Sequence, residues 1–439
     1  MRRFSIVFFM IWASVQITEG IGSANGVIRD SIGTISSGRG GTNLAASDNS
    51  ALIYDNPAAL SRMSGLNWDL TMDILSTNIT YNDPQNDKKA KKQIIPLPGL
   101  AGVYKSEKSN LAFGLGVFYP AGFAAEYELI HGGDLPIYGT QTYKSEVSLL
   151  KVLPAVAWQA TDRLSIGAAV GPAFQSTKLD MPFTFQTGAL AGTPALIDLK
   201  TDGTGYAWNL GLQYKFSEKL TFGAVYLSKT AVTLKGDMDV DVTDHPVLGG
   251  LLASMGAETT ANYDVKIDFT WPQTLGGGLS YEPNPMHHFL TDVQWIRWAS
   301  AFDEIHLKLS NGNNAGFNAL LGGSSSLEDT LPLDWENSYS FKLGYEYLRE
   351  RNTFQAGYIY NKNPVPNNTL TPLIPGILEH ALSLGYKHKG QRWTLSSAYQ
   401  YSFGPKQYVG TSKIIGGDFD NSYVEVNAHW VFFNLMYTF

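Results

Sequence analysis

Hydrophobic and polar residues alternate along much of this chain. Between Tyr339 and Tyr347 the odd-numbered residues are aromatic or aliphatic, and the even-numbered ones are polar or glycine. Runs that begin near Trp68, Leu220 and Phe354 repeat the pattern. A period of two, with one apolar and one polar face, is typical of a half-buried β-strand. The pattern therefore predicts an all-β protein.

The length of these runs separates two classes of β protein. Strands of soluble sandwiches are usually about 5 or 6 residues long. Many runs here are longer and carry Tyr or Trp at the ends of the apolar face. Membrane-spanning strands need about 9 to 11 residues, with aromatic residues at both interfaces, and they must close on themselves because lipid does not tolerate an open sheet edge. We therefore predict a transmembrane β-barrel.

The connections between the strands alternate between short turns and longer loops. Short polar turns are expected near 105–110, 160–163, 216–219, 282–287, 349–352 and 387–392. Longer loops are expected near 82–96, 121–142, 180–202, 237–260, 309–334, 363–378 and 406–421. Six turns and seven loops give fourteen antiparallel strands. In such barrels the short turns lie on the periplasmic side and the long loops lie outside the cell.

Both ends of the chain agree with export to an outer membrane. A positive head, an apolar stretch over 4–15 and small residues up to Ala24 predict a secretory signal at residues 1–24, with cleavage after Gly20 as the alternative. Val431 to Phe439 form an amphipathic strand that resembles the signal read by the outer-membrane barrel assembly machinery, which we expect as a partner. We expect a monomer in the outer membrane of a Gram-negative cell, in contact with membrane lipid and lipopolysaccharide.

Composition and motifs argue against several other functions. A net charge of −7 and a pI near 5.6 imply no nucleic-acid partner. Cysteine is absent, which excludes disulfides and thiolate metal sites. The acidic run 237–244 lacks the loop of a calcium site, and His287 and His288 have no carboxylate at ligand spacing. No nucleotide motif or nucleophile elbow is present, so we expect no metal, no cofactor and no enzymatic activity.

Several segments, in order, resemble the FadL/TodX family of outer-membrane transporters of long-chain fatty acids and other hydrophobic compounds. They are SSGRGGTNLAASDNSALIYDNPAAL, GLGVFYPAGFAAEY, LPAVAWQATDRLSIGAAVG, WNLGLQYKFSEKLTFGAVYLSK, WPQTLGGGLSYEPNP, TDVQWIRWASAFDEI and FQAGYIYNKNPVPNNTLTPLIPG. The resemblance implies that residues 25–64 form a plug inside a 14-stranded barrel of residues 65–439.

The same resemblance implies a gate. It places the turn Asn56-Pro57-Ala58 of the plug against an inward kink in the third strand, where a hole opens in the barrel wall. Without the resemblance, Asn56-Pro57 is simply a rigid connecting turn. The residues expected at the kink are Gly114, Gly116, Pro120, Gly122 and Phe123. Proline cannot donate to the strand ladder and glycine weakens it, so this segment should pair poorly with its neighbour.

Apolar loop residues are candidates for the first capture of a ligand outside the cell. They are Leu190, Leu196, Val247, Leu248, Leu251, Leu252 and Met255. The alternative is that these loops only pack on one another above the barrel mouth. Lys178 is a candidate lumenal contact for a carboxylate, although barrel interiors hold many charges.

The sequence therefore predicts passive outer-membrane transport of long-chain fatty acids or similar molecules, with lateral release at the kinked third strand. No energy-coupling motif is present, so the gradient should drive transport. Aromatic hydrocarbons are an alternative cargo, and a general porin or structural barrel is an alternative function. The plug of about forty residues favours the transporter, because an open porin needs none.

Overall fold

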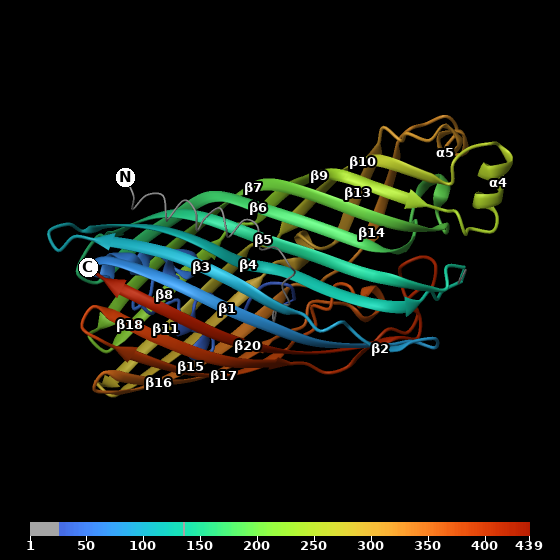
Figure 1. Ribbon diagram of the computed structural model, residues 1–439. Coiled ribbons are helices and arrows are strands. Elements are labelled where there is room, and N and C mark those ends of the chain that lie inside the picture. The colour runs from blue at the N-terminus through green and yellow to red at the C-terminus, as the bar shows by residue number, and fades with distance from the viewer. Residues whose placement is uncertain (1–25, 135–136) are drawn as a thin grey trace.

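The computed structural model describes residues 26–134 and 137–439, so the signal expected at residues 1–24 lies outside the described residues. The strands form one antiparallel sheet that closes where the last strand pairs with the first (Figure 1). The wall strands are β1 (Gly65–Asn82), β3 (Ile94–Lys105), β4 (Leu111–Ile130), β5 (Thr140–Gln159), β6 (Leu164–Thr184), β7 (Pro194–Ser217), β8 (Leu220–Leu227) with β9 (Thr230–Asp241), β10 (Thr260–Trp271) with β11 (Thr274–Asn284), β12 (His287–Ile296) with β13 (Glu304–Ser310), β14 (Leu327–Pro332) with β15 (Ser338–Arg349), β16 (Asn352–Asn361), β17 (His380–Lys389), β18 (Trp393–Phe403) and β20 (Tyr423–Thr438). The prediction of fourteen strands is confirmed.

Four wall strands consist of two pieces because a short irregular segment interrupts each of them. Pro272, for example, lies between β10 and β11 and cannot donate a ladder hydrogen bond. Two short strands, β2 (Asp87–Lys89) and β19 (Gln407–Tyr408), add to the sheet within loops. The six predicted turns all fall between paired strands and lie at the end of the barrel that carries the C-terminus (Figure 1).

Helices are short and lie in the plug and the loops. Residues 26–64, the predicted plug, contain α2 (Thr34–Gly38), α3 (Leu52–Asp55) and the 3-10 helix η1 (Pro57–Arg62). Most of these residues are buried, and the three helices contact wall strands, so we call this segment the plug. The loops contain η2 (Gly188–Leu190), α4 (Leu248–Ser254), η3 (Trp298–Ser300), α5 (Ala315–Leu320) and η4 (Asn367–Thr369), with α4 and α5 at the far end of the barrel from the C-terminus (Figure 1). Within residues 26–134 and 137–439, none of the helices has the length and apolarity needed to cross a membrane.

The apolar face of each strand points outward over only part of its length. On β17, Leu382 and Leu384 are 53% and 66% exposed, while Ser383 between them is buried. Towards the extracellular end the pattern reverses. On β1 the outward positions change from Leu70 and Met72 to polar residues such as Asn78, and the inward positions change from aspartates to Leu75, Ile79 and Tyr81. The strands therefore continue well beyond the lipid, with water outside and an apolar interior.

This reversal corrects two of the predicted loops. The segments 121–142 and 180–202 are mostly strand, because β4 runs to Ile130, β5 starts at Thr140, β6 runs to Thr184 and β7 starts at Pro194. Their outward positions are charged and pair across strands, as Lys178 of β6 does with Glu146 of β5 at 3.2 Å. Because the outward positions of these strand ends are polar, their sequence resembles that of a loop.

Candidate functional site

The barrel wall has one long break in pairing, between β3 and β4. These strands pair regularly from Lys105 and Ala112 up to Leu100 and Val117, and no further. Beyond that point, the remainder of β3 (94–99) pairs only with β1. On its other edge β4 stays paired with β5, with a register shift between Phe118 and Ala121. We call this break the window.

The window lies at the level of the outer half of the lipid-facing belt. The unpaired part of β3 is in register with 71–76 of β1, where the outward apolar side chains of β1 end. At the extracellular side the segment after β2 closes it, because the Ala90 N–H donates to Ile79 (2.9 Å) and the Lys91 N–H donates to Glu126 (2.7 Å). The window is therefore a bounded break in the strand pairing, level with the end of the apolar outer face of β1.

The first residues of the plug occupy the inner side of the window. Ile28 pairs with Ala121 as an isolated antiparallel bridge. The Arg29 N–H donates to the Pro120 carbonyl and the Gly122 N–H donates to the Val27 carbonyl, each at 3.0 Å. This three-residue segment, Val27–Arg29, uses backbone groups of β4 that β3 leaves unpaired.

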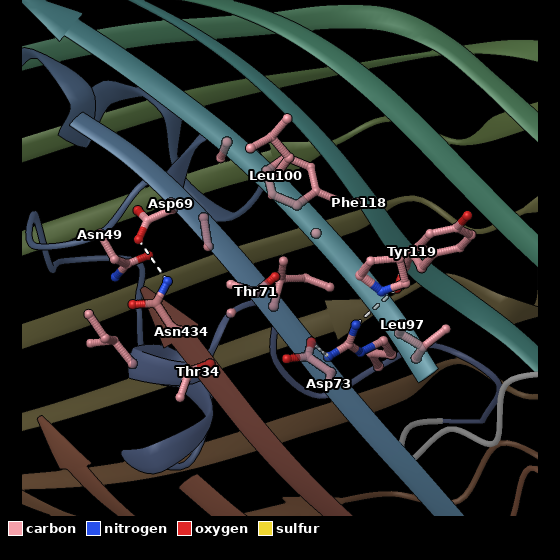
Figure 2. Close-up of a pocket in the computed structure, with 18 residues that line it drawn as sticks. Thr34, Asn49, Asp69, Thr71, Asp73, Leu97, Leu100, Phe118, Tyr119 and Asn434 are labelled. Atoms are coloured by element: carbon pink, nitrogen blue, oxygen red, sulfur yellow. Dashed lines mark hydrogen bonds and ion pairs between the residues drawn. The ribbon is translucent and has the colours of Figure 1, made fainter. Parts of the chain in front are cut away.

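Arg29 connects the two sides of the window. Its guanidinium donates to Asp73 of β1 at 2.5 Å and to the Tyr119 carbonyl of β4 at 3.3 Å, and it lies 4.9 Å from the ring centre of Trp430. Both charged side chains of the pair are at most 4% exposed. Figure 2 shows Asp73 and Tyr119 close together at one end of the pocket, where dashed lines mark these bonds. Breaking one partner of a buried pair is costly, so Arg29 holds the segment in place.

A cavity lies directly behind the window. Its volume is about 30 Å³, it lies between the plug, β1, β3 and β4, and its walls include Thr71, Leu97, Gly99 and Phe118 (Figure 2). We call it the window cavity. It has both polar and apolar lining: Asp69, Asp73 and Asn434 of the wall are polar, and Leu97, Leu100 and Phe118 are apolar.

A second cavity lies on the lumenal side of Val27–Arg29. Its volume is about 40 Å³, and Arg29 and Ile32 border both this cavity and the window cavity. Lys151 of β5 points into it, is 6% exposed, and has its ammonium 5.7 Å from the ring centre of Tyr54. No acidic side chain in the described part of the chain lies within ion-pair distance of this ammonium. We call this the lysine cavity.

A largely apolar cavity lies nearer the extracellular end. Its volume is about 130 Å³, and its lining includes Phe123, Val147, Phe183, Phe269 and Leu373. Phe123 lies two residues beyond Ala121, which borders the lysine cavity. The apolar cavity, the lysine cavity and the window cavity therefore follow one another from the barrel mouth to the wall.

The plug is fixed to the barrel by buried charges near its periplasmic end. The fully buried Arg39 guanidinium donates to Asp48 at 2.9 Å and to Glu346 of β15 at 3.1 Å. Lys387 of β17 donates to Asp48 at 3.0 Å. Burial favours the neutral form of Asp48, but the charges of Arg39 and Lys387 hold its pKa well below the usual range. Asp292 of β12 adds two bonds to plug N–H groups of Asn43 and Leu44.

The position implied for Asn56-Pro57-Ala58 is wrong in one respect. The turn does not lie against the kink but against β6 and β7, where Gly167 and Gly211 leave room for it. The Asn56 amide donates to the carbonyls of Leu44 and Leu212, and its oxygen accepts from the Ala58 N–H. The turn therefore anchors the plug, and Val27–Arg29 contacts the kink instead.

The predicted kink residues divide into two groups. Pro120 and Gly122 lie at the register shift and bond to the plug, and Gly122 has a φ of 152°, which favours glycine. Gly114 and Gly116 lie before the break, in regular pairing with β3. A side chain at Gly114 would clash with Ile53 and Leu60 of the plug, and one at Gly116 would clash with the Phe118 ring. Phe123 lines the apolar cavity.

The capture residues are not brought together at one surface. Val247, Leu251 and Met255 of the α4 loop are 66%, 41% and 50% exposed, and Leu248 is half-buried. Leu252 is fully buried and contacts α5 at Gly316. Leu190 is buried in the main apolar cluster, and Leu196 is on the outer face of β7, whereas its neighbour Ile197 lines the apolar cavity. Packing of the loops on each other therefore accounts for part of this set.

Lys178 requires a correction. It borders the apolar cavity, but its side chain lies on the outer face of β6, like Val170 and Phe174, and donates to Glu146 at 3.2 Å. The ammonium therefore does not point into the lumen. The inward lysine that sequence reasoning could have singled out is Lys151, since Val156 and Trp158 of the same strand are at outward positions.

Comparisons with known proteins agree with this architecture. The chain is 25% identical over 427 residues to a putative outer membrane protein of Neisseria meningitidis, with 90% of each chain covered. It is 21% identical over 358 residues to a long-chain fatty acid transport protein of Escherichia coli, covering 74% of this chain and 75% of that one.

Solved structures show the same fold at low sequence identity. The toluene transporter TodX of Pseudomonas putida aligns with a TM-score of 0.76 at 20% identity, and a FadL homologue of Pseudomonas aeruginosa aligns with a TM-score of 0.76 at 17% identity. Each alignment covers 94% of this chain and 100% of the other. The family described as outer membrane protein transport protein (OMPP1/FadL/TodX) matches residues 16–439. The chain therefore belongs to the OMPP1/FadL/TodX family of outer-membrane transport proteins.

Proposed function

We propose that this protein carries long-chain fatty acids or similar hydrophobic molecules passively across the polar outer surface of the membrane and releases them sideways through the window. The observation that carries the proposal is the break between β3 and β4, which lies at lipid level and has a cavity directly behind it. Cargo would pass from the apolar cavity to the lysine cavity and then to the window cavity.

The hydrophobic effect explains why a sideways route suits such cargo. Each methylene kept from water is worth about 0.8 kcal/mol, so a chain of about 15 methylenes gains about 12 kcal/mol by staying in an apolar environment. Release into an aqueous periplasm would forfeit this gain. Movement from the apolar cavity into the hydrocarbon through the window conserves most of it.

Lys151 favours an acidic head group on the cargo. A buried ammonium without a carboxylate partner is costly, and an anionic ligand would supply that partner. The neutral alternative, an aromatic hydrocarbon, would use only the apolar lining. The lysine cavity is therefore the place at which the two cargo classes should differ.

Lys151→Met tests this distinction, because methionine keeps the apolar volume and removes the charge. A hydrogen bond to a charged group contributes about 1.5–3 kcal/mol, so uptake of a dilute labelled fatty acid should fall about tenfold or more, while uptake of toluene should not change. Uptake is measured in cells that lack other transporters of this family. Lys178→Met, which removes an outward ammonium from the next strand, serves as the control.

The outcomes separate the candidate functions. An equal loss for both cargoes would mean that Lys151 has a structural role. No loss for either, with toluene transported well, would favour the neutral cargo. Failure of the unaltered protein to raise uptake of either compound above background would contradict transport of hydrophobic molecules and favour a porin or structural barrel.

The exposed half of the α4 loop gives a second test. Replacing Val247, Leu251 and Met255 by serine should weaken the initial binding of a labelled fatty acid to cells without changing barrel stability, because these side chains are solvent-exposed. Leu252→Ser is the contrasting variant: it opens a cavity against α5 and should destabilise the loop itself. Unchanged binding in the triple variant would exclude this surface from capture.

A further inference from the structure

Basic residues gather at one side of the periplasmic rim. The β15–β16 turn carries Arg349 and Arg351, and the β17–β18 turn carries Lys389 and Arg392. The two turns are neighbours, because the Lys389 N–H donates to the Arg351 carbonyl at 2.8 Å. All four side chains are exposed. We call these four residues the rim patch.

Other exposed cations, such as Lys108, Arg163 and Lys219, also form no ion pair with a described residue, but the rim patch gathers four such cations on two adjacent turns. At the extracellular end, Lys200 pairs with Asp198 at 2.7 Å, Lys266 pairs with Asp268 at 3.0 Å, and Lys308 and Lys362 have similar carboxylate partners. None of the rim patch residues forms an ion pair with any described residue. Glu350 is the single acidic residue in these two turns.

Aromatic side chains border the rim patch on the lipid-facing wall. Phe354, Tyr386 and Trp393 are 50%, 39% and 39% exposed. The rings of Phe354 and Tyr386 contact each other at 5.5 Å between centres. Exposed aromatic residues on a membrane barrel mark the boundary between hydrocarbon and head groups. The cations lie just beyond that boundary.

Along the membrane normal, the cations of the rim patch lie at the level of the lipid head groups. Lys389 lies three residues beyond Tyr386 on β17, which is about 10 Å along a strand and about 7 Å along the membrane normal at a tilt near 45°. The head-group layer extends about 5–7 Å beyond the hydrocarbon on each side. Long basic side chains also reach along such a surface with their charged ends in the polar layer.

We propose that the rim patch binds the phosphate groups of anionic phospholipids in the periplasmic leaflet. Four unpaired cations on two adjacent turns complement negative charge. The aromatic border continues directly from the lipid-facing belt and suits the glycerol and upper acyl regions of the same lipid. An acidic periplasmic protein would have to dock beside the bilayer surface, where the head groups already lie.

The test uses the purified full chain, stripped of lipid in detergent and titrated with phosphatidylglycerol or phosphatidylcholine. Native mass spectrometry counts the lipid retained. The unaltered protein should prefer phosphatidylglycerol, and changing Arg349, Arg351, Lys389 and Arg392 to glutamine should reduce its binding at least about tenfold. The matched control changes Lys200, Lys266, Lys308 and Lys362 to glutamine, which removes the same charge from paired positions.

Several results would overturn the proposal. They are equal binding of the two lipids, an undiminished preference in the rim variant, and an equal loss in the control variant. Full competition by inorganic phosphate would indicate a free-anion site, and selective binding of an acidic protein by lipid-saturated barrels would indicate a protein-docking surface. If the fourfold variant fails to assemble, judged by heat-dependent gel migration, Arg351→Gln with Lys389→Gln tests the same contact with a smaller change.

Discussion

A disulfide between cysteines placed at Ile28 and Ala121 is expected to stop uptake, and its reduction is expected to restore uptake. The two residues face each other in a bridge whose flanking N–H groups, those of Arg29 and Gly122, make the backbone bonds. Such non-hydrogen-bonded pairs have Cα atoms about 4.5 Å apart, within the range of about 4.4–6.8 Å that a disulfide spans. The chain has no cysteine of its own, so the cross-link is unique.

The cross-link would fix Val27–Arg29 to the kink and keep the lysine cavity apart from the window cavity. Fatty-acid uptake by cells with the oxidised Ile28→Cys/Ala121→Cys protein should fall to that of cells without the protein. Each single cysteine variant should transport normally under oxidising and reducing conditions. Undiminished uptake by fully cross-linked protein would show that cargo does not need this segment to move, and would exclude release through the window.

Arg39→Met is expected to convert a sealed barrel into one that conducts ions. Arg39 is fully buried and donates to Asp48, Glu346, Asn43 and the Thr42 carbonyl. Removing one partner of a buried ion pair costs about 3–5 kcal/mol. Here Lys387 remains beside both carboxylates and offsets part of that cost. The plug contains few other charged contacts of this kind, so its docking equilibrium should shift markedly toward release.

Planar bilayers measure this effect directly. The unaltered protein should show little steady conductance, and Arg39→Met should show stable open steps. Arg62→Met is the control, since Arg62 belongs to the same plug but is only partly buried and donates to the exposed Arg163 carbonyl. A sealed Arg39→Met barrel with normal heat-dependent gel migration would show that other contacts, such as those of Asp292 and Asn56, suffice to hold the plug.

Period-two alternation predicted the barrel well because the lipid-facing side chains repeat regularly. The pairing of 339–347 with β12 and β16, and the positions of all six short turns, match the expectation. The extracellular ends of β4 to β7 were missed because polarity reverses there. Beyond the lipid, an outward residue is charged and an inward residue is apolar, so a strand with the same geometry gives the opposite pattern.

The same reversal explains the error at Lys178. A polar residue within the lipid belt of β6 points inward, but Lys178 lies above that belt, where polar residues point outward. Counting by twos from Val170 and Phe174 would have placed it on the outer face.

The sequence did not predict the contact of Val27–Arg29 with the kink, for a different reason. It joins residues about ninety positions apart through backbone bonds, and a three-residue strand has no periodicity from which pairing can be inferred. The position of Asn56-Pro57-Ala58 likewise depends on Gly167 and Gly211, two close approaches that sequence spacing does not reveal.

The height of the window has a consequence for what happens after release. Its unpaired edge is in register with the upper part of the apolar belt of β1, close to where that belt ends. Under the proposed lateral release, a molecule leaving there would arrive in the leaflet nearest the environment, still one monolayer away from the periplasm. The remaining journey is flip-flop through the bilayer, and its speed would depend on the packing of the surrounding acyl chains and on how readily a head group sheds its charge.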